Sequence, residues 1–142
     1  LFGTAPERLT AFLQSKGCRM EPSGPAFHNL TYITESGEGR LAIPRELHRL
    51  PVGALQLLLD AYVRENAECK IDYIHGADAV RKLGSIHGNV GFYLPAMDKN
   101  ELFPTVSQNG ALPRKTFSMG EACEKRYYME CRMIVDNEDG IV

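Results

Sequence analysis

Residues 52–66 read VGALQLLLDAYVREN, and this stretch decides how the rest of the chain must fold. Its apolar side chains recur every three or four residues, at Leu55, Leu58, Leu59, Tyr62 and Val63. This spacing predicts an α-helix with one apolar face. Because such a face must pack against another layer, the flanking segments have to supply a sheet or further helices.

The chain ahead of this helix begins with a second, shorter helix. Thr4 and Glu7 have the spacing of a capping box, in which each side chain bonds to a free backbone amide of the first turn. Apolar residues follow at helical spacing, and Gly17 can take the left-handed conformation that ends a helix. The sequence therefore predicts a helix over 5–16.

A β-hairpin is predicted next, so that residues 1–50 form a helix plus a hairpin. Strand-forming residues occupy 30–33 and 40–43, and the Ser-Gly-Glu-Gly sequence of 36–39 suits the loop between them. A two-stranded hairpin is marginally stable alone and needs a covering layer.

Beyond residue 66 the pattern alternates between strand and helix. A strand over 70–74, a helix over 77–83 and an apolar strand over 90–94 predict a right-handed crossover and a partly parallel sheet. A further helix is expected over 99–108, opened by a capping box of Asp98 and Glu101.

The last forty residues leave two structures open. A strand is expected over 115–117, while 121–134 fits a helix after a Ser118 capping box and also fits a strand, because its apolar residues alternate at period two. Residues 136–142 form an acidic tail. The fold class is therefore mixed α/β: a single domain over 1–142, with helix and strand units over 51–135, in which amphipathic helices pack on a small mixed sheet.

Composition excludes several functional classes. The 142 residues carry 16 Lys plus Arg against 18 Asp plus Glu, a net charge of −2, which argues against nucleic-acid binding. No apolar run reaches the roughly 18 to 20 residues that cross a membrane, so we expect a cytoplasmic protein. The four cysteines show no Cys-x-x-Cys spacing, and we expect free thiols and no metal site.

Two segments are candidate anion sites. His75 and Gly76 follow a predicted strand and precede a predicted helix, whose positive N-terminal end favours a phosphate. Asp78 opposes an anion there, and the alternative is a plain turn with a half-buried His75. Neither a P-loop nor a Rossmann pattern is present.

The second candidate is a cationic clamp in which two adjacent cations are followed by two hydroxyl residues. Arg114 can hold oxygens in a bidentate manner and Lys115 acts as a point charge, with Thr116 and Ser118 as hydroxyl donors. The alternative is that these cations pair on the surface with the acidic residues Glu121, Glu124 and Glu130.

Catalytic residues are not identified by any pattern. Carboxylates are available at Asp60, Asp72, Asp78 and Asp98, but the sequence places no pair of them across a substrate. Neither a Gly-x-Ser-x-Gly elbow nor a His-Glu-x-x-His motif is present. The catalytic residues are therefore unknown at this level.

One family resemblance rests on a long run of residues. The most specific part is Pro113-Arg114-Lys115-Thr116-Phe117-Ser118-Met119-Gly120-Glu121, followed by Glu124-Lys125-Arg126-Tyr127-Tyr128. Together with Val90-Gly91-Phe92-Tyr93-Leu94-Pro95 and Tyr73-Ile74-His75-Gly76-Ala77-Asp78, about 70 residues resemble the C-terminal end of the uncharacterised bacterial family named domain of unknown function 1015.

The resemblance implies a longer parent protein. Family members have an N-terminal part similar to the ParB and sulfiredoxin group, with an Asp-Gly-His-His-Arg type motif like that of nucleotide-dependent free-serine kinases. This chain lacks that motif and begins with Leu1, so we expect a C-terminal fragment that supports a nucleotide- or phosphometabolite-handling site built mainly elsewhere. A nucleotide is then a cofactor of the full-length protein, with none expected in the fragment.

A different class of function stays open beside it. The alternative is a non-catalytic structural or interaction module, whose apolar faces pack on the remainder of the parent chain or on a second copy in a homo-oligomer.

Overall fold

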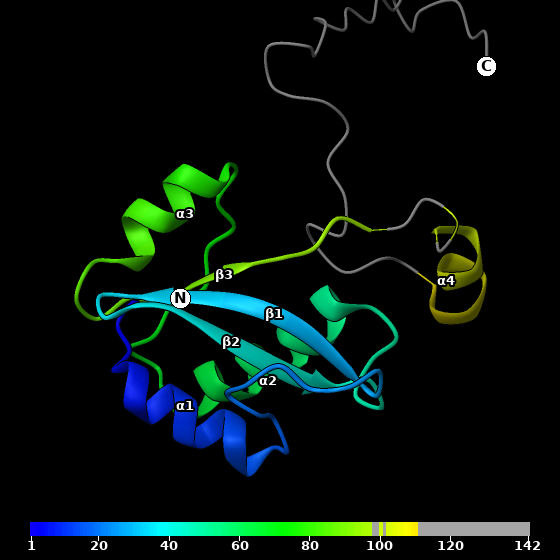
Figure 1. Cartoon of the computed structure of the whole chain (residues 1–142), viewed down its shortest axis with the longest axis horizontal. Coiled ribbons are helices and arrows are strands. Elements are labelled where there is room, and N and C mark those ends of the chain that lie inside the picture. The colour runs from blue at the N-terminus through cyan, green and yellow to red at the C-terminus, as the bar shows by residue number, and fades with distance from the viewer. Residues whose placement is uncertain (98–99, 101, 111–142) are drawn as a thin grey trace, which may run out of the picture.

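The computed structural model of the chain describes residues 1–97, 100 and 102–110. Figure 1 labels its elements. In chain order they are α1 (Pro6–Ser15), β1 (Phe27–Thr34), β2 (Gly37–Pro44), α2 (Pro51–Glu65), α3 (Ala77–Gly84), β3 (Gly91–Tyr93) and α4 (Leu102–Asn109). The mixed α/β class expected from the sequence is confirmed, as are the expected helices over 5–16, 52–66 and 77–83.

The strands form a three-stranded sheet in the order β2-β1-β3. The β1–β2 hairpin turns within two residues, because Thr34 pairs directly with Gly37, whose φ of 115° is readily adopted only by glycine. β3 pairs with the other side of β1, and both pairings are antiparallel. The expectation of a partly parallel sheet is therefore wrong for the described residues.

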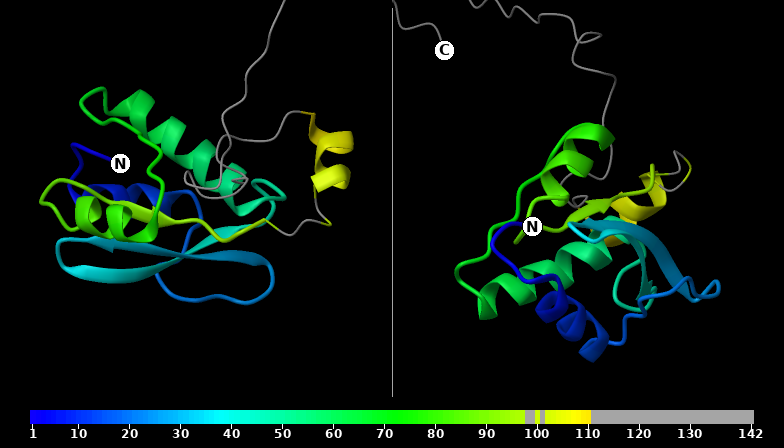
Figure 2. Two further views of the ribbon diagram at one scale, coloured as in Figure 1. Left: turned by 90° about the horizontal axis from the view of Figure 1, so that it is seen from above. Right: turned by 60° about the vertical axis from the view of Figure 1, so that its left-hand side comes forward.

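Helices cover both faces of this sheet. Leu30 and Leu41 pair across the hairpin and belong to the main core with residues of α1 and α2. The Ile33 side chain, three positions after Leu30 in β1, points to the other face of the sheet, because side chains alternate along a strand. There the Ile33 carbonyl lies near Gly84 of α3. Figure 2 (right) accordingly shows the strands between α3 on one side and α1 and α2 on the other.

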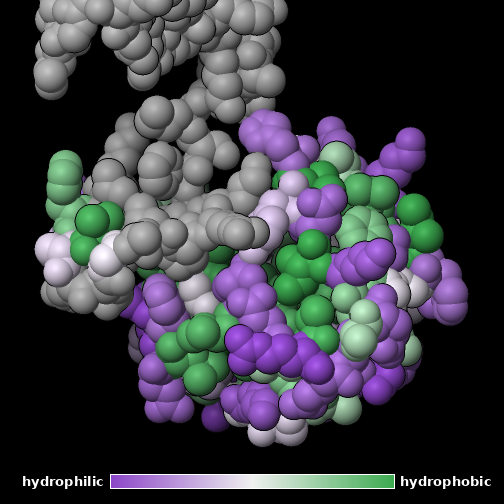
Figure 3. Space-filling view, turned by 180° about the vertical axis from the view of Figure 1, so that it is seen from behind, coloured by the Kyte–Doolittle hydropathy of each residue, from purple (hydrophilic) through white to green (hydrophobic). Residues whose placement is uncertain are grey.

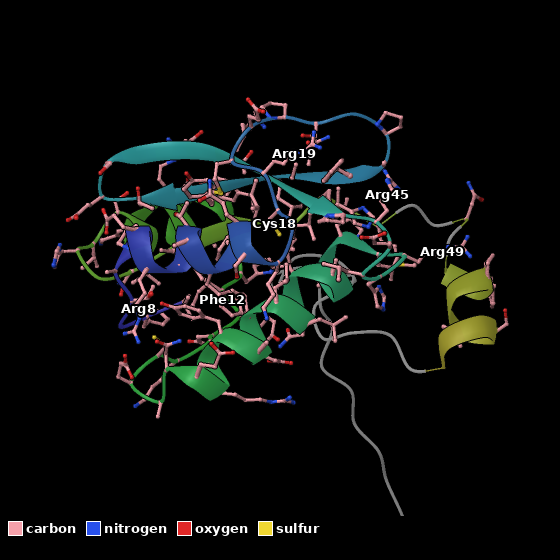
Figure 4. The ribbon with its side chains drawn as sticks, turned by 90° about the horizontal axis from the view of Figure 1, so that it is seen from below. Arg8, Phe12, Cys18, Arg19, Arg45 and Arg49 are labelled. Carbon is pink, nitrogen blue, oxygen red and sulfur yellow. The ribbon has the colours of Figure 1, made fainter. Side chains whose placement is uncertain are left out.

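Tyr62 of α2 stands at the centre of the main core and is 1% exposed. Its ring meets that of Phe12 edge-on, with 5.1 Å between centroids, and Phe12 projects from α1 as Figure 4 shows. Its hydroxyl lies 2.7 Å from the Thr4 hydroxyl. The expected capping box at Thr4 and Glu7 is therefore wrong: Ala5 is the N-cap of α1, without a side-chain bond, and the Thr4 hydroxyl is paired in the core.

The strand expected over 70–74 is also absent from the described structure. Only Lys70 takes part in a β-bridge, with Phe2, and residues 71–75 form neither helix nor strand. Residues 115–117, 121–134 and the tail 136–142 lie outside the described residues. Within the described part, no helix has the length and apolar character needed to traverse a bilayer.

Candidate functional site

A cleft of about 320 Å³ opens along the free edge of β3. α2 forms one wall and α3 the other, while the chain over 71–76 lies across from β3. From behind, Figure 3 shows apolar surface exposed among hydrophilic side chains on the side of the molecule that carries α2. The lining residues are Leu1, Phe2, Val52, Leu55, Gln56, Leu59, residues 71–77, Val80, Leu83, Gly84 and residues 89–94.

The α2 wall is a continuation of the apolar helix face seen in the sequence. Val52, Leu55 and Leu59 line the cleft and are at most 8% exposed, and Leu55 and Leu59 also belong to the main core. This wall is therefore held rigidly by the packing of the domain.

The α3 wall is positioned by a close approach of two backbones. A Cβ placed on Gly84 would lie 2.9 Å from the amide nitrogen of Gly91, and a Cβ on Gly91 would lie 2.9 Å from Cγ1 of Val80. Two glycines therefore let α3 sit directly on β3. Val80 and Leu83 are then left half-buried at the cleft.

The polar groups at the cleft are bonded to one another or to nearby backbone. The Tyr73 hydroxyl donates to Oε1 of Gln56, whose amide nitrogen donates to Oδ1 of Asp60 at 2.7 Å. The Tyr93 hydroxyl reaches the carbonyl of Ala77 at 3.4 Å. These groups fix the rim of the cleft more readily than they would bind a ligand, since a ligand would have to break bonds already made.

His75 and Gly76, predicted from the sequence as an anion site, do line the cleft at the N-terminus of α3. Gly76 is the N-cap, with φ of 91°, and no side chain caps the helix. His75 is exposed, so the alternative of a half-buried histidine is wrong. Asp78 lies in the first turn, where its charge opposes an anion.

Within the described part of the chain, cationic side chains do not converge on this cleft. None of the described residues that line it is Lys or Arg. Arg8 pairs with Glu68, Arg19 stacks over the Phe27 ring, and Arg45 donates to the Phe27 carbonyl. Figure 4 shows these three arginines in other parts of the molecule. The predicted clamp of Arg114, Lys115, Thr116 and Ser118 lies outside the described residues.

The candidate aspartates give no acid–base pair across the cleft among the described residues. Asp60 is engaged by Gln56, Oδ1 of Asp72 accepts the amide of Tyr73 at 2.7 Å, and Asp78 is exposed on α3. Asp98 lies outside the described residues. Among the residues described, no cluster of three His, Cys, Asp or Glu could hold a metal ion.

The feature that sequence reasoning missed is the place of Leu1 and Phe2. These two residues close one end of the cleft, and Leu1 is only 9% exposed. Burial lowers the pKa of its ammonium group, which donates to the Val90 carbonyl at 2.8 Å. Two residues are too few to show any periodicity, so no pattern could have indicated this.

Comparison with known proteins identifies no relative: no family model, curated protein or solved structure matches the chain.

Proposed function

We propose that this domain is a non-catalytic interaction module whose cleft packs against an apolar polypeptide segment. The observation that carries the proposal is the lining of the cleft, which combines apolar walls from α2 and α3 with an absence of Lys and Arg among its described residues. Phosphorylated metabolites are usually held by Arg or Lys side chains. An apolar polypeptide needs no such cation.

The chemistry of the rim supports the same proposal. Gln56, Tyr73 and Asp60 already form a chain of hydrogen bonds, so a partner gains less from these side chains than from burial of apolar surface. Half-buried side chains such as Ile74, Val80 and Leu83 supply that surface. The partner we favour is polypeptide from a longer parent protein, which agrees with the resemblance to domain of unknown function 1015.

A second candidate function is support of a nucleotide- or phosphometabolite-handling site. It is favoured by one observation, that His75 and Gly76 border the cleft at the N-terminus of α3. Arg114 and Lys115 would then add cations that the described lining of the cleft does not include.

A matched pair of isoleucines tests the interaction module. Ile74 lines the cleft, whereas Ile86 is 51% exposed outside it. We would measure binding of the chain to an array of defined twelve-residue peptides, apolar, acidic, basic and phosphorylated. Capture by apolar peptides should be lost in Ile74→Asp and kept in Ile86→Asp.

The competing function is measured on the same preparations. Melting temperature is followed with ATP, ADP, CTP and inorganic phosphate, because a ligand that binds the folded state raises it. A nucleotide-dependent rise, together with no difference between the two isoleucine variants, would replace the interaction module by the second candidate.

A further inference from the structure

The strongest unexplained feature is that Leu1 and Phe2 already behave as a minimal central strand. Leu1 and Val90 exchange both backbone hydrogen bonds, each at 2.8 Å. Phe2 and Lys70 exchange theirs at 2.9 and 3.1 Å on the opposite side. Consecutive residues that bond to opposite sides are the signature of a strand held between two neighbours.

This pairing fixes the gap between the two neighbours. Phe2 forms antiparallel bridges with both Lys70 and Asn89, so these residues stand two strand spacings apart, roughly 9.5 Å. From there the chain runs from Lys70 into 71–76 on one side and from Asn89 into β3 on the other. The cleft lies between them.

The register can be continued into the cleft one residue at a time. Positions one to four before Leu1 would face Gly91 to Leu94 on one side and Asp72 to His75 on the other, and all eight of these residues line the cleft. Because Val90 directs its N–H and carbonyl toward Leu1, period two directs those of Phe92 and Leu94 the same way, into the cleft.

We propose that the cleft receives a polypeptide segment joined to the nitrogen of Leu1, which lies there as an extended strand of at least four residues antiparallel to β3. The proposal rests on the interaction module above and specifies its mode of binding, β-strand addition at a sheet edge. Apolar side chains are required on both faces of the strand, since Leu55 of α2 meets one face and Val80 of α3 meets the other.

The added strand accounts for the sequence pattern of residues 70–74. This segment has strand-forming residues but, apart from Lys70, is unpaired as a strand in the described structure. With the new strand in place it becomes its outer neighbour and runs parallel to β3, because both are antiparallel to the strand between them. α3 is then the crossover helix between two parallel strands.

The buried amino group of Leu1 fits the same picture. A peptide bond at this nitrogen keeps the N–H that bonds to Val90 and removes a charge from an enclosed position. A strand in line with Leu1 would therefore enter without breaking any bond that the sheet now makes there.

The test is a pair of extended chains that differ at one residue. Val-Ile-Val-Ile is added before Leu1 in the first and Val-Ile-Pro-Ile in the second, so that proline replaces the residue facing Phe92 and removes its N–H. Hydrogen exchange is measured at the amides of Phe92 and Leu94, with Leu41 in the core as the reference. In the first chain we expect exchange at Phe92 and Leu94 about tenfold slower than in the proline chain.

Every other outcome overturns one or both proposals. Equal exchange at Phe92 in the two extended chains overturns strand addition, and if apolar peptides still bind in the array, the interaction module survives without it. If no apolar peptide binds and neither extension has an effect, both proposals fail together. Protection of Phe92 that rises with concentration of the unextended chain would mean that a second copy occupies the cleft, which also overturns the proposal.

Discussion

The pairing of Thr4 with Tyr62 gives the sharpest stability prediction, because two structures compete for the Thr4 hydroxyl. In the observed one it bonds to the Tyr62 hydroxyl at 2.7 Å, and both residues are at most 4% exposed. In the capping box it would bond to a backbone amide of α1 and would be indifferent to Tyr62. The variants Tyr62→Phe, Thr4→Val and their combination separate the two.

The expected magnitude follows from the burial of both hydroxyls. Either single substitution removes a bond and leaves the other hydroxyl buried without this partner, which costs about 1–2 kcal/mol of unfolding free energy. The double variant replaces the pair by two apolar groups and should cost no more than one single variant. The coupling free energy is then about 1 kcal/mol or more.

Urea unfolding of the four chains measures this coupling, provided that the m value is unchanged. Thr10→Val is the control: its hydroxyl bonds to the Pro6 carbonyl within α1, so its effect should add to that of Tyr62→Phe without coupling. If Thr4→Val costs the same free energy with Tyr62 and with phenylalanine at that position, the hydroxyl acts as a helix cap and our reasoning is refuted.

Two further predictions concern the close approach of backbones and the buried thiol. Gly84→Ala should destabilise the fold by about 1–3 kcal/mol, because the new Cβ meets Gly91 at 2.9 Å, whereas Gly24→Ala, with open space around it, should be nearly neutral in the same urea experiment. Burial raises the pKa of the Cys18 thiol to about 11 from 9.0, so at pH 8 its thiolate is roughly a hundredfold scarcer than in the unfolded chain and iodoacetamide should label it only after unfolding. Since the unfolded chain loses this proton first, the thiol also makes stability fall as pH rises from 9 toward 11; labelling of the native chain as fast as in urea would contradict this.

The spacing of apolar residues was enough to predict an element wherever one side of that element is buried along its whole length. α2 begins and ends within one residue of its expected bounds, since its apolar face is repeated over four turns. The strands expected for the hairpin, 30–33 and 40–43, are shorter than the observed β1 and β2. The residues that extend them include polar side chains, and the turn occupies two residues where a longer loop was expected.

Prediction failed where the structure of a side chain or segment depends on residues that lie far away along the chain. Thr4 and Glu7 satisfy the capping pattern, but Tyr62, fifty-eight residues away, offers the threonine a buried hydroxyl. Residues 70–74 satisfy the strand pattern, but a strand forms only beside a neighbour, and Phe2 reaches only Lys70. His75 and Gly76 were correctly placed before a helix, while the lack of Lys and Arg among the described residues that line the cleft depends on how distant segments fold together.

By itself, the sequence determined the helices, the hairpin and the mixed α/β class, because these follow from the spacing of apolar residues over a few turns or strand positions. Only the tertiary structure decided that the sheet is antiparallel, that Gly84 and Gly91 bring α3 onto β3, and that a cleft runs between α2 and α3 in line with Leu1. The physical reason is that an open sheet edge is a property of two separated strands: its hydrogen-bonding groups exist in the sequence of each, but their spacing and direction are set by residues far away along the chain.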